Sequence, residues 1–185
     1  MNIDHSLYQL INQTMVSSWA DWLMVTVSNK WTWLPFYVLL LVLGYKAFRN
    51  KVFWMLLCVV MAVGASDQIC SSIMKPLFKR ERPCHNLSLS PRLPQSVGCS
   101  DSYSMASSHA ANHFGIAVFL ILLMPTMPIL YKSIALFWAA MIAYSRVYCG
   151  VHYPSDVIVG AMVGVLMAFS AYWVYKKGME TFKWI

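Results

Sequence analysis

The sequence contains few charged residues. They make up 11% of its 185 residues, and only 7 residues are acidic, whereas hydrophobic residues make up 59%. A soluble domain carries about 25% charged residues, because water must solvate its surface. The scarcity of charge therefore excludes an ordinary soluble domain and indicates that a lipid bilayer surrounds most of the chain.

A continuous basic face is also lacking, although the net charge is +7. The cations lie at the ends of apolar runs, which excludes a nucleic-acid partner and is typical of membrane-edge residues. The basic segment of a cleavable signal peptide is missing as well, because Asp4 stands in its place. The length of 185 residues predicts one domain, spanning residues 1–185, and no internal repeat appears.

Long apolar runs, in contrast, are abundant. A hydrocarbon core of about 30 Å needs roughly 20 helical residues. We expect an all-α fold, a bundle of six transmembrane helices preceded by a short interfacial helix at residues 6–15. A long polar loop is expected at residues 76–105. The predicted spans are residues 18–29, 31–45, 52–74, 107–125, 129–146 and 157–175.

The distribution of basic residues predicts how the chain is oriented in the membrane, provided that some of them bind an anion. Six spans would place both ends of the chain, Lys46 and Lys132 on one face, and each face would then carry half of the 14 basic residues. If Lys75, Arg82 and Arg146 bind an anion instead of marking a membrane edge, the excess lies with the termini. That excess predicts cytoplasmic termini and an extracytoplasmic loop.

Cysteine is sparse, with 5 residues, and two of them share the long loop. A disulfide between Cys84 and Cys99 would order a loop that has little core of its own. The alternative is a pair of free thiols. Cys58, Cys70 and Cys149 are expected to be small packed residues.

Two histidines and a carboxylate supply the groups that phosphoryl transfer needs. His152 is the candidate nucleophile, and Asp156 follows it by four residues. The carboxylate could bond one ring nitrogen and leave the other free to attack. A His–Asp pair at this spacing is usually structural, but Arg146 lies just upstream at the same membrane edge. His109 begins another span and is suited to protonate the leaving oxygen.

Five further residues are candidates for binding the phosphate. Ser107 and Ser108 lie at a predicted helix N-terminus, where they could bind phosphate or merely cap the helix. Lys75, Arg82 and Arg146 could neutralise the phosphate oxygens. Taken singly, each would be an ordinary cation at the end of a span.

The remaining polar residues carry weaker signals. Lys79 and Arg80 are expected to be membrane-edge cations or to attract anionic headgroups. Asp67 lies within a span, where we expect a structural hydrogen bond or a pairing with a site cation. His113 follows His109 by one helical turn, but no third ligand stands at a usable spacing for zinc. We expect neither a metal nor a cofactor.

These residues resemble the signature motifs of the type 2 phosphatidic acid phosphatase superfamily. The resemblance covers residues 75–156 and implies a metal-independent membrane enzyme that hydrolyses lipid phosphates or diphosphates. It also implies a phosphohistidine on His152, support from Asp156 and an acid role for His109. The matches are Lys75, Arg82 and Pro83 in the first motif, Ala106-Ser107-Ser108-His109 in place of Pro-Ser-Gly-His in the second, and Ser145, Arg146, His152 and Asp156 in the third.

The expected activity is that of an undecaprenyl-diphosphate phosphatase at the outer face of a bacterial inner membrane. Lipid A phosphatase and phosphatidylglycerophosphate phosphatase are the alternatives. The expected partners are a lipid phosphate substrate and membrane lipids. A lipid-headgroup carrier is disfavoured because binding alone needs no nucleophile, and vanadium haloperoxidases share the motifs but are soluble.

Overall fold

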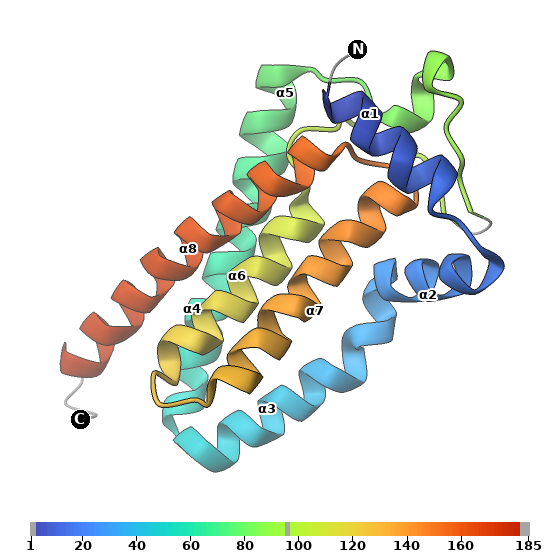
Figure 1. Ribbon diagram of the computed structural model, residues 1–185. Helices are drawn as coiled ribbons and strands as arrows, with labels where there is room; N and C mark the ends of the chain where they lie inside the picture. Colours follow the sequence, from blue (N-terminus) through green and yellow to red (C-terminus); the bar gives the residue numbers. More distant parts are fainter. Residues whose placement is uncertain (1–2, 95–96, 182–185) are drawn as a thin grey trace.

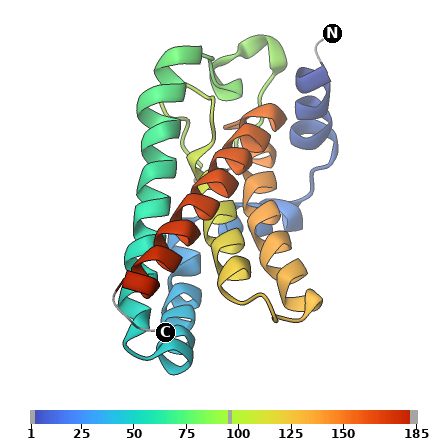
Figure 2. The same cartoon turned by 90° about the vertical axis from the view of Figure 1, so that its left-hand side faces the viewer.

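The computed structural model describes residues 3–94 and 97–181, and helices are the regular secondary structure found in these ranges. Four long helices run side by side, and α6 packs against the other three (Figures 1 and 2). The all-α expectation is confirmed within the described ranges. The four are α4 (Lys51–Gln68), α6 (Ser108–Leu123), α7 (Ile129–Tyr148) and α8 (Pro154–Thr181).

Within the described residues, three helical segments are long and apolar enough to cross a bilayer. They are Lys30–Phe48, which includes α3 (Leu34–Phe48), Lys51–Phe78, which continues α4 through a π-helical stretch into α5 (Lys75–Phe78), and Pro154–Thr181. Helix α6 is apolar but shorter. The protein is therefore an integral membrane protein.

Helix α2 (Ser18–Ser28) does not have the length of a span. Its 11 residues cover about 16 Å at 1.5 Å per residue, roughly half of the hydrocarbon thickness. It lies across the bundle and packs against α7 (Figure 1). Trp19 and Trp22 on this helix are exposed, as in a helix that lies at the membrane surface. The expected count of six spans is therefore not confirmed.

The N-terminal helix lies at the same end of the bundle as the start of α8. Helix α1 (Ile3–Gln9) contacts α8 there, and the last described residues of α8 lie at the opposite end (Figure 1). The expectation that both ends of the chain share one face is therefore wrong. It depended on residues 18–29 crossing the membrane. Lys183, counted with that face, lies outside the described residues.

Helix α1 continues into a π-helical turn, Leu10–Thr14, that fastens the long loop to the bundle. The Asn12 side chain donates to the carbonyl oxygens of Arg92 at 2.7 Å and Tyr148 at 2.8 Å. Gln13 donates to the Ser90 carbonyl oxygen at 3.0 Å. The segment expected to be interfacial is helical, but it packs on protein, with Tyr8 and Asn12 buried.

Glycines let α8 approach α6 closely. A Cβ atom at Gly160 would lie 2.4 Å from the Ser107 carbonyl oxygen, and one at Gly164 would lie 2.0 Å from a carbonyl oxygen one turn along α6. Small residues four positions apart permit this approach of two backbones. The backbone N–H of Ser107 consequently donates to the Asp156 carbonyl oxygen at 3.0 Å. Packing thus brings together the starts of α6 and α8, which carry His109 and Asp156.

Candidate active site

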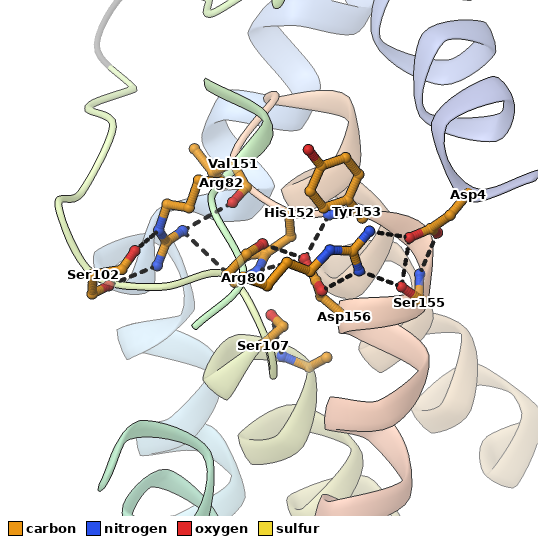
Figure 3. A network of polar contacts seen from close by, with 12 residues as sticks. Asp4, Arg80, Arg82, Ser102, Ser107, Val151, His152, Tyr153, Ser155 and Asp156 are labelled. Atoms are coloured by element: carbon orange, nitrogen blue, oxygen red, sulfur yellow. Dashed lines mark hydrogen bonds and ion pairs between the residues drawn. The ribbon is translucent and has the colours of Figure 1, made fainter. Parts of the chain in front are cut away.

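His152 lies in the short connection between α7 and α8. Gly150, with a φ of 78°, lets the chain turn out of α7. The His152 ring is 3% exposed. Its Nε2 atom lies 3.4 Å from Nη1 of Arg82, and its Nδ1 atom lies 3.5 Å from Oδ2 of Asp156 (Figure 3). One nitrogen therefore faces the carboxylate, and the other faces a cation suited to phosphate.

Burial keeps His152 neutral. Loss of hydration lowers the pKa of His152 to about 4, and the nearby Asp156 carboxylate opposes this shift. The charges of Arg82 and Arg146 act in the same direction as burial. At neutral pH the imidazole is unprotonated, which is the form that a nucleophile requires.

Asp156 is fully buried and is held by partners from three segments. Its Oδ2 atom accepts hydrogen bonds from the Ser104 hydroxyl and, at 2.8 Å, from the Tyr153 backbone N–H. Its Oδ1 atom accepts a hydrogen bond from Arg80 at 2.8 Å (Figure 3). The expectation that Arg80 is a membrane-edge cation is therefore wrong, because its guanidinium reaches a buried carboxylate 76 positions away.

Arg82 is held in place by backbone and hydroxyl groups. Its Nε atom donates to the Ser102 carbonyl oxygen at 2.7 Å, and Nη2 donates to the Ser102 hydroxyl at 3.0 Å. Its Nη1 atom donates to the Val151 carbonyl oxygen at 2.9 Å. Arg82 is 5% exposed, and its guanidinium is fixed beside His152, which suits a rigid phosphate ligand.

Arg146 and Lys75 bring further positive charge to the same place. Arg146 donates to the Ser28 hydroxyl, and within the described residues its buried Nε atom has no hydrogen-bond partner. Lys75 lies within electrostatic range of both Arg82 and Arg146. Three neighbouring cations repel one another, and an anion bound between them would relieve that repulsion. The cluster is therefore suited to bind an anion.

The start of α6 supplies the remaining predicted residues. Ser107 caps the helix, because its hydroxyl accepts from the Ala110 N–H at 3.5 Å. The Ser108 hydroxyl lies 3.3 Å from that of Ser71. His109 lies within electrostatic range of His152, Arg146 and Lys75. Helix geometry leaves the N–H groups of Ser108 and His109 without a carbonyl partner inside the helix.

Two intramembrane polar residues have structural partners. The Nδ1 atom of His113 bonds the His109 carbonyl oxygen at 2.7 Å, and the Tyr37 hydroxyl lies 3.0 Å from its Nε2 atom. Asp67 accepts a hydrogen bond from Ser71 at 3.5 Å. His113 therefore links α6 to α3 and supports the residue that carries the candidate acid.

Cys84 and Cys99 form a disulfide, as expected, and enclose part of the long loop. His85 lies beside them, and in the described part of the chain these three residues are the one cluster of metal-ligand type found. A metal would be bound by thiolates, and the two sulfur atoms are instead bonded to each other in the disulfide. Cys58, Cys70 and Cys149 are free and buried.

Removing the disulfide should weaken both folding and activity. Arg82 and Ser102, which bond each other, flank the closed loop on its two sides. We expect Cys84→Ser with Cys99→Ser to lower stability by about 3 kcal/mol, the chain-entropy value for a 15-residue loop. We also expect kcat/KM to fall because Arg82 loses its fixed position. Thermal unfolding and phosphate release measure both, with Cys58→Ala as the control, and unchanged values would contradict the expectation.

Sequence reasoning missed the residues that hold the site together. Ser104 and Ser102 lie in an irregular loop, where no spacing distinguishes them from the other serines. Asp4 was treated only as a sign against a signal peptide, yet it bonds Arg80 and Ser155. The one available signal was an acidic residue in a membrane protein that has few of them.

The sequence matches a known family and named relatives. Residues 53–180 match the PAP2 superfamily. A lipid A 4'-phosphatase of Bacteroides thetaiotaomicron is 32% identical over 95% of this chain and 78% of its own length. An undecaprenyl-diphosphatase of Sulfolobus acidocaldarius is 30% identical over 88% of this chain and 74% of its own length.

A solved structure agrees with the fold. The crystal structure of Aquifex aeolicus LpxE has a TM-score of 0.71 and 24% identity, and covers 92% of this chain and 95% of that chain. The family match spans more than half of the chain, and named phosphatases align over most of its length. This membrane protein is therefore a lipid phosphatase of the PAP2 superfamily.

Proposed function

We propose that this enzyme removes a phosphate group from a lipid A-type glycolipid through a phosphohistidine on His152. The observation that carries the proposal is a buried, neutral imidazole beside Arg82 and Arg146, with Lys75 within electrostatic range of both cations. Such a cluster stabilises the charge on the phosphate oxygens without a metal.

The reaction runs in two steps. The Nε2 atom of His152 attacks phosphorus, the bond between phosphorus and the lipid oxygen breaks, and His109 gives that oxygen a proton. His109 then takes a proton from water, which attacks the phosphohistidine and releases inorganic phosphate. Asp156 faces Nδ1 throughout and stabilises the positive charge that develops on the ring.

An apolar cavity next to His109 would hold the lipid part of the substrate. It has a volume of about 430 Å³ and lies between α3, α4 and α6. Its walls include Tyr37, Leu40, Met55, Val59, His109 and Ile116. An apolar pocket that contains the leaving-group acid suits a substrate whose leaving oxygen is attached to a lipid.

The relatives support lipid A ahead of undecaprenyl diphosphate, which the sequence reasoning ranked first. The lipid A 4'-phosphatase aligns over a larger share of this chain and at slightly higher identity than the undecaprenyl-diphosphatase. Undecaprenyl diphosphate is the second candidate because its relative also aligns over most of the chain. Both substrates offer a phosphate on an apolar anchor.

The proposal places the single domain, residues 1–185, in a bacterial inner membrane with the site facing outward. The disulfide supports this side, because disulfides persist in oxidising compartments. Two of the cations at the site end, Arg80 and Arg92, are paired with acids, whereas basic residues gather at the opposite end as they do on cytoplasmic faces. Those at the opposite end are Lys46, Arg49, Lys51, Lys132, Lys176 and Lys177.

A substrate panel tests the proposal. Purified enzyme in excess chelator should release phosphate from lipid A with a kcat/KM at least about tenfold above that for undecaprenyl diphosphate or phosphatidylglycerophosphate, a preference of about 1.4 kcal/mol. Vanadate should inhibit the reaction. A preference for undecaprenyl diphosphate would overturn the substrate assignment. Strict dependence on an added metal ion would overturn the mechanism.

A further inference from the structure

Arg80 joins two carboxylates that come from opposite ends of the sequence. It lies between α5 and the loop that begins at Pro83. Its Nη1 atom donates to Oδ1 of Asp156 at 2.8 Å, and its Nη2 atom pairs with Oδ2 of Asp4 (Figure 3). The guanidinium carbon also lies 3.8 Å from the centre of the Tyr153 ring. These contacts hold the planar group in one orientation.

The contact between Arg80 and Asp156 affects the electrostatic environment of the His152 ring. Arg80 takes one carboxylate oxygen, and the other oxygen, held by Ser104, faces Nδ1 of His152. Arg80 therefore sets both the direction of the carboxylate and the share of its negative charge that acts on the imidazole. Arg80 can act on His152 in this way, through Asp156, without touching Lys75, Arg82 or Arg146.

Asp4 limits how strongly the positive charge of Arg80 acts on Asp156. It accepts hydrogen bonds from the Ser155 backbone N–H at 2.9 Å and from the Ser155 hydroxyl at 2.6 Å, which fix it at the start of α8. Its carboxylate then shares the Arg80 charge with Asp156. The four groups form a row of Asp4, Arg80, Asp156 and His152, with opposite charges on neighbouring members when the imidazole is protonated.

We propose that Arg80 is a positioning residue for the Asp156–His152 pair and that Asp4, on α1, sets how strongly Arg80 acts on it. The inference rests on the proposed role of His152 as the nucleophile. It gives the N-terminal helix a part in catalysis, although that helix lies outside the residues that match the family.

Two substitutions should move the protonation of His152 in opposite directions. In Arg80→Met, Asp156 keeps its full negative charge, which favours the imidazolium and raises the pKa of His152. In Asp4→Asn, Asp156 is the one carboxylate that still pairs with Arg80, so more of the Arg80 charge acts on Asp156 and the pKa of His152 falls. The other groups facing His152 are Arg82 from the loop, Arg146 from α7 and His109 from α6, and they are the same in both variants.

The experiment compares kcat, KM and the acidic limb of the pH–rate profile in the full-length enzyme with a lipid phosphate substrate. Arg80→Met should lower kcat by about 10- to 100-fold, the loss usual for a group that orients a functional residue, while KM changes less than about threefold. The acidic limb should move upward by about half a pH unit or more in Arg80→Met and downward in Asp4→Asn. Arg80→Lys should recover part of kcat. Lys79→Met is the matched control, because Lys79 is an exposed neighbouring cation.

Several results would overturn the inference. An unchanged kcat in Arg80→Met would do so, as would a rise in KM with kcat preserved, which would indicate direct binding of the phosphate. A shift of the limb in the same direction in both charge variants would indicate only loosened structure. If Arg80→Met does not fold, two other results decide the question. The acidic limb of Asp4→Asn should move downward relative to wild type, and the kcat of Arg80→Lys should be lower than that of wild type while its KM stays nearly unchanged. An active His152→Ala variant would instead show that the proposed function fails.

Discussion

Replacing His152 with alanine is expected to lower kcat by about ten-thousand-fold or more, since removing a nucleophile eliminates the covalent route. The imidazole is buried and neutral, and one of its nitrogens faces the Arg82 guanidinium at 3.4 Å. No other side chain described beside Arg82 offers a comparable nucleophile. The measurement is phosphate release from a lipid phosphate, together with trapping of labelled phosphate on the wild-type protein.

His85→Ala is the matched control for this substitution. His85 is exposed in the long loop, beside the disulfide, and it should keep nearly full activity. A labelled phosphoenzyme that disappears in His152→Ala but persists in His85→Ala would support the nucleophile. Substantial turnover by His152→Ala would show that water attacks the lipid phosphate directly.

Replacing His109 with alanine should have an effect that depends on the leaving group. A lipid alkoxide is a poor leaving group and needs a proton, so kcat on a lipid phosphate should fall by about 100- to 10,000-fold. Nitrophenyl phosphate releases a stabilised phenolate and needs little protonation, so its phosphoryl transfer should fall by much less. The expectation follows from the position of His109, which lines the apolar cavity and lies within electrostatic range of His152.

Arg82→Met provides the comparison for the His109 experiment. Arg82 is placed to bind the phosphoryl group that is transferred, so its loss should slow both substrates by similar factors. The burst of phosphoenzyme formation should be measured, because His109 is also proposed to activate water in the second step. Equal losses on the two substrates in His109→Ala would contradict the role of proton donor.

Local patterns in the sequence predicted much of the membrane architecture. Apolar runs in the sequence correspond to helices at α3, α4 and α8, because the bilayer requires internally bonded backbone across its thickness. The same reasoning failed for residues 18–29. That segment is apolar and helical, but α2 is too short to cross and lies against α7. Composition alone does not distinguish a short span from a helix at the membrane surface.

The candidate site, like the membrane architecture, was predicted from the sequence only in part. Its motif residues were recognisable because each lies near a predicted span end and carries a charge or an imidazole that an apolar chain seldom uses. Arg80 carries the same charge and lies two positions before Arg82, yet its partner is the Asp156 carboxylate. Spacing indicated which residues are candidates for catalysis, but it could not separate residues suited to bind phosphate from residues that hold the carboxylate.

The sequence by itself determined that this protein lies in a membrane and carries the motif residues of a lipid phosphatase, because hydropathy and residue type are local properties. Only the tertiary structure decided that α1 lies beside the active site and that Asp4 and Asp156 share one guanidinium. Those contacts join positions 76 residues apart. They depend on the close packing of α6 on α8 and on the path of the loop, which no short stretch of sequence specifies.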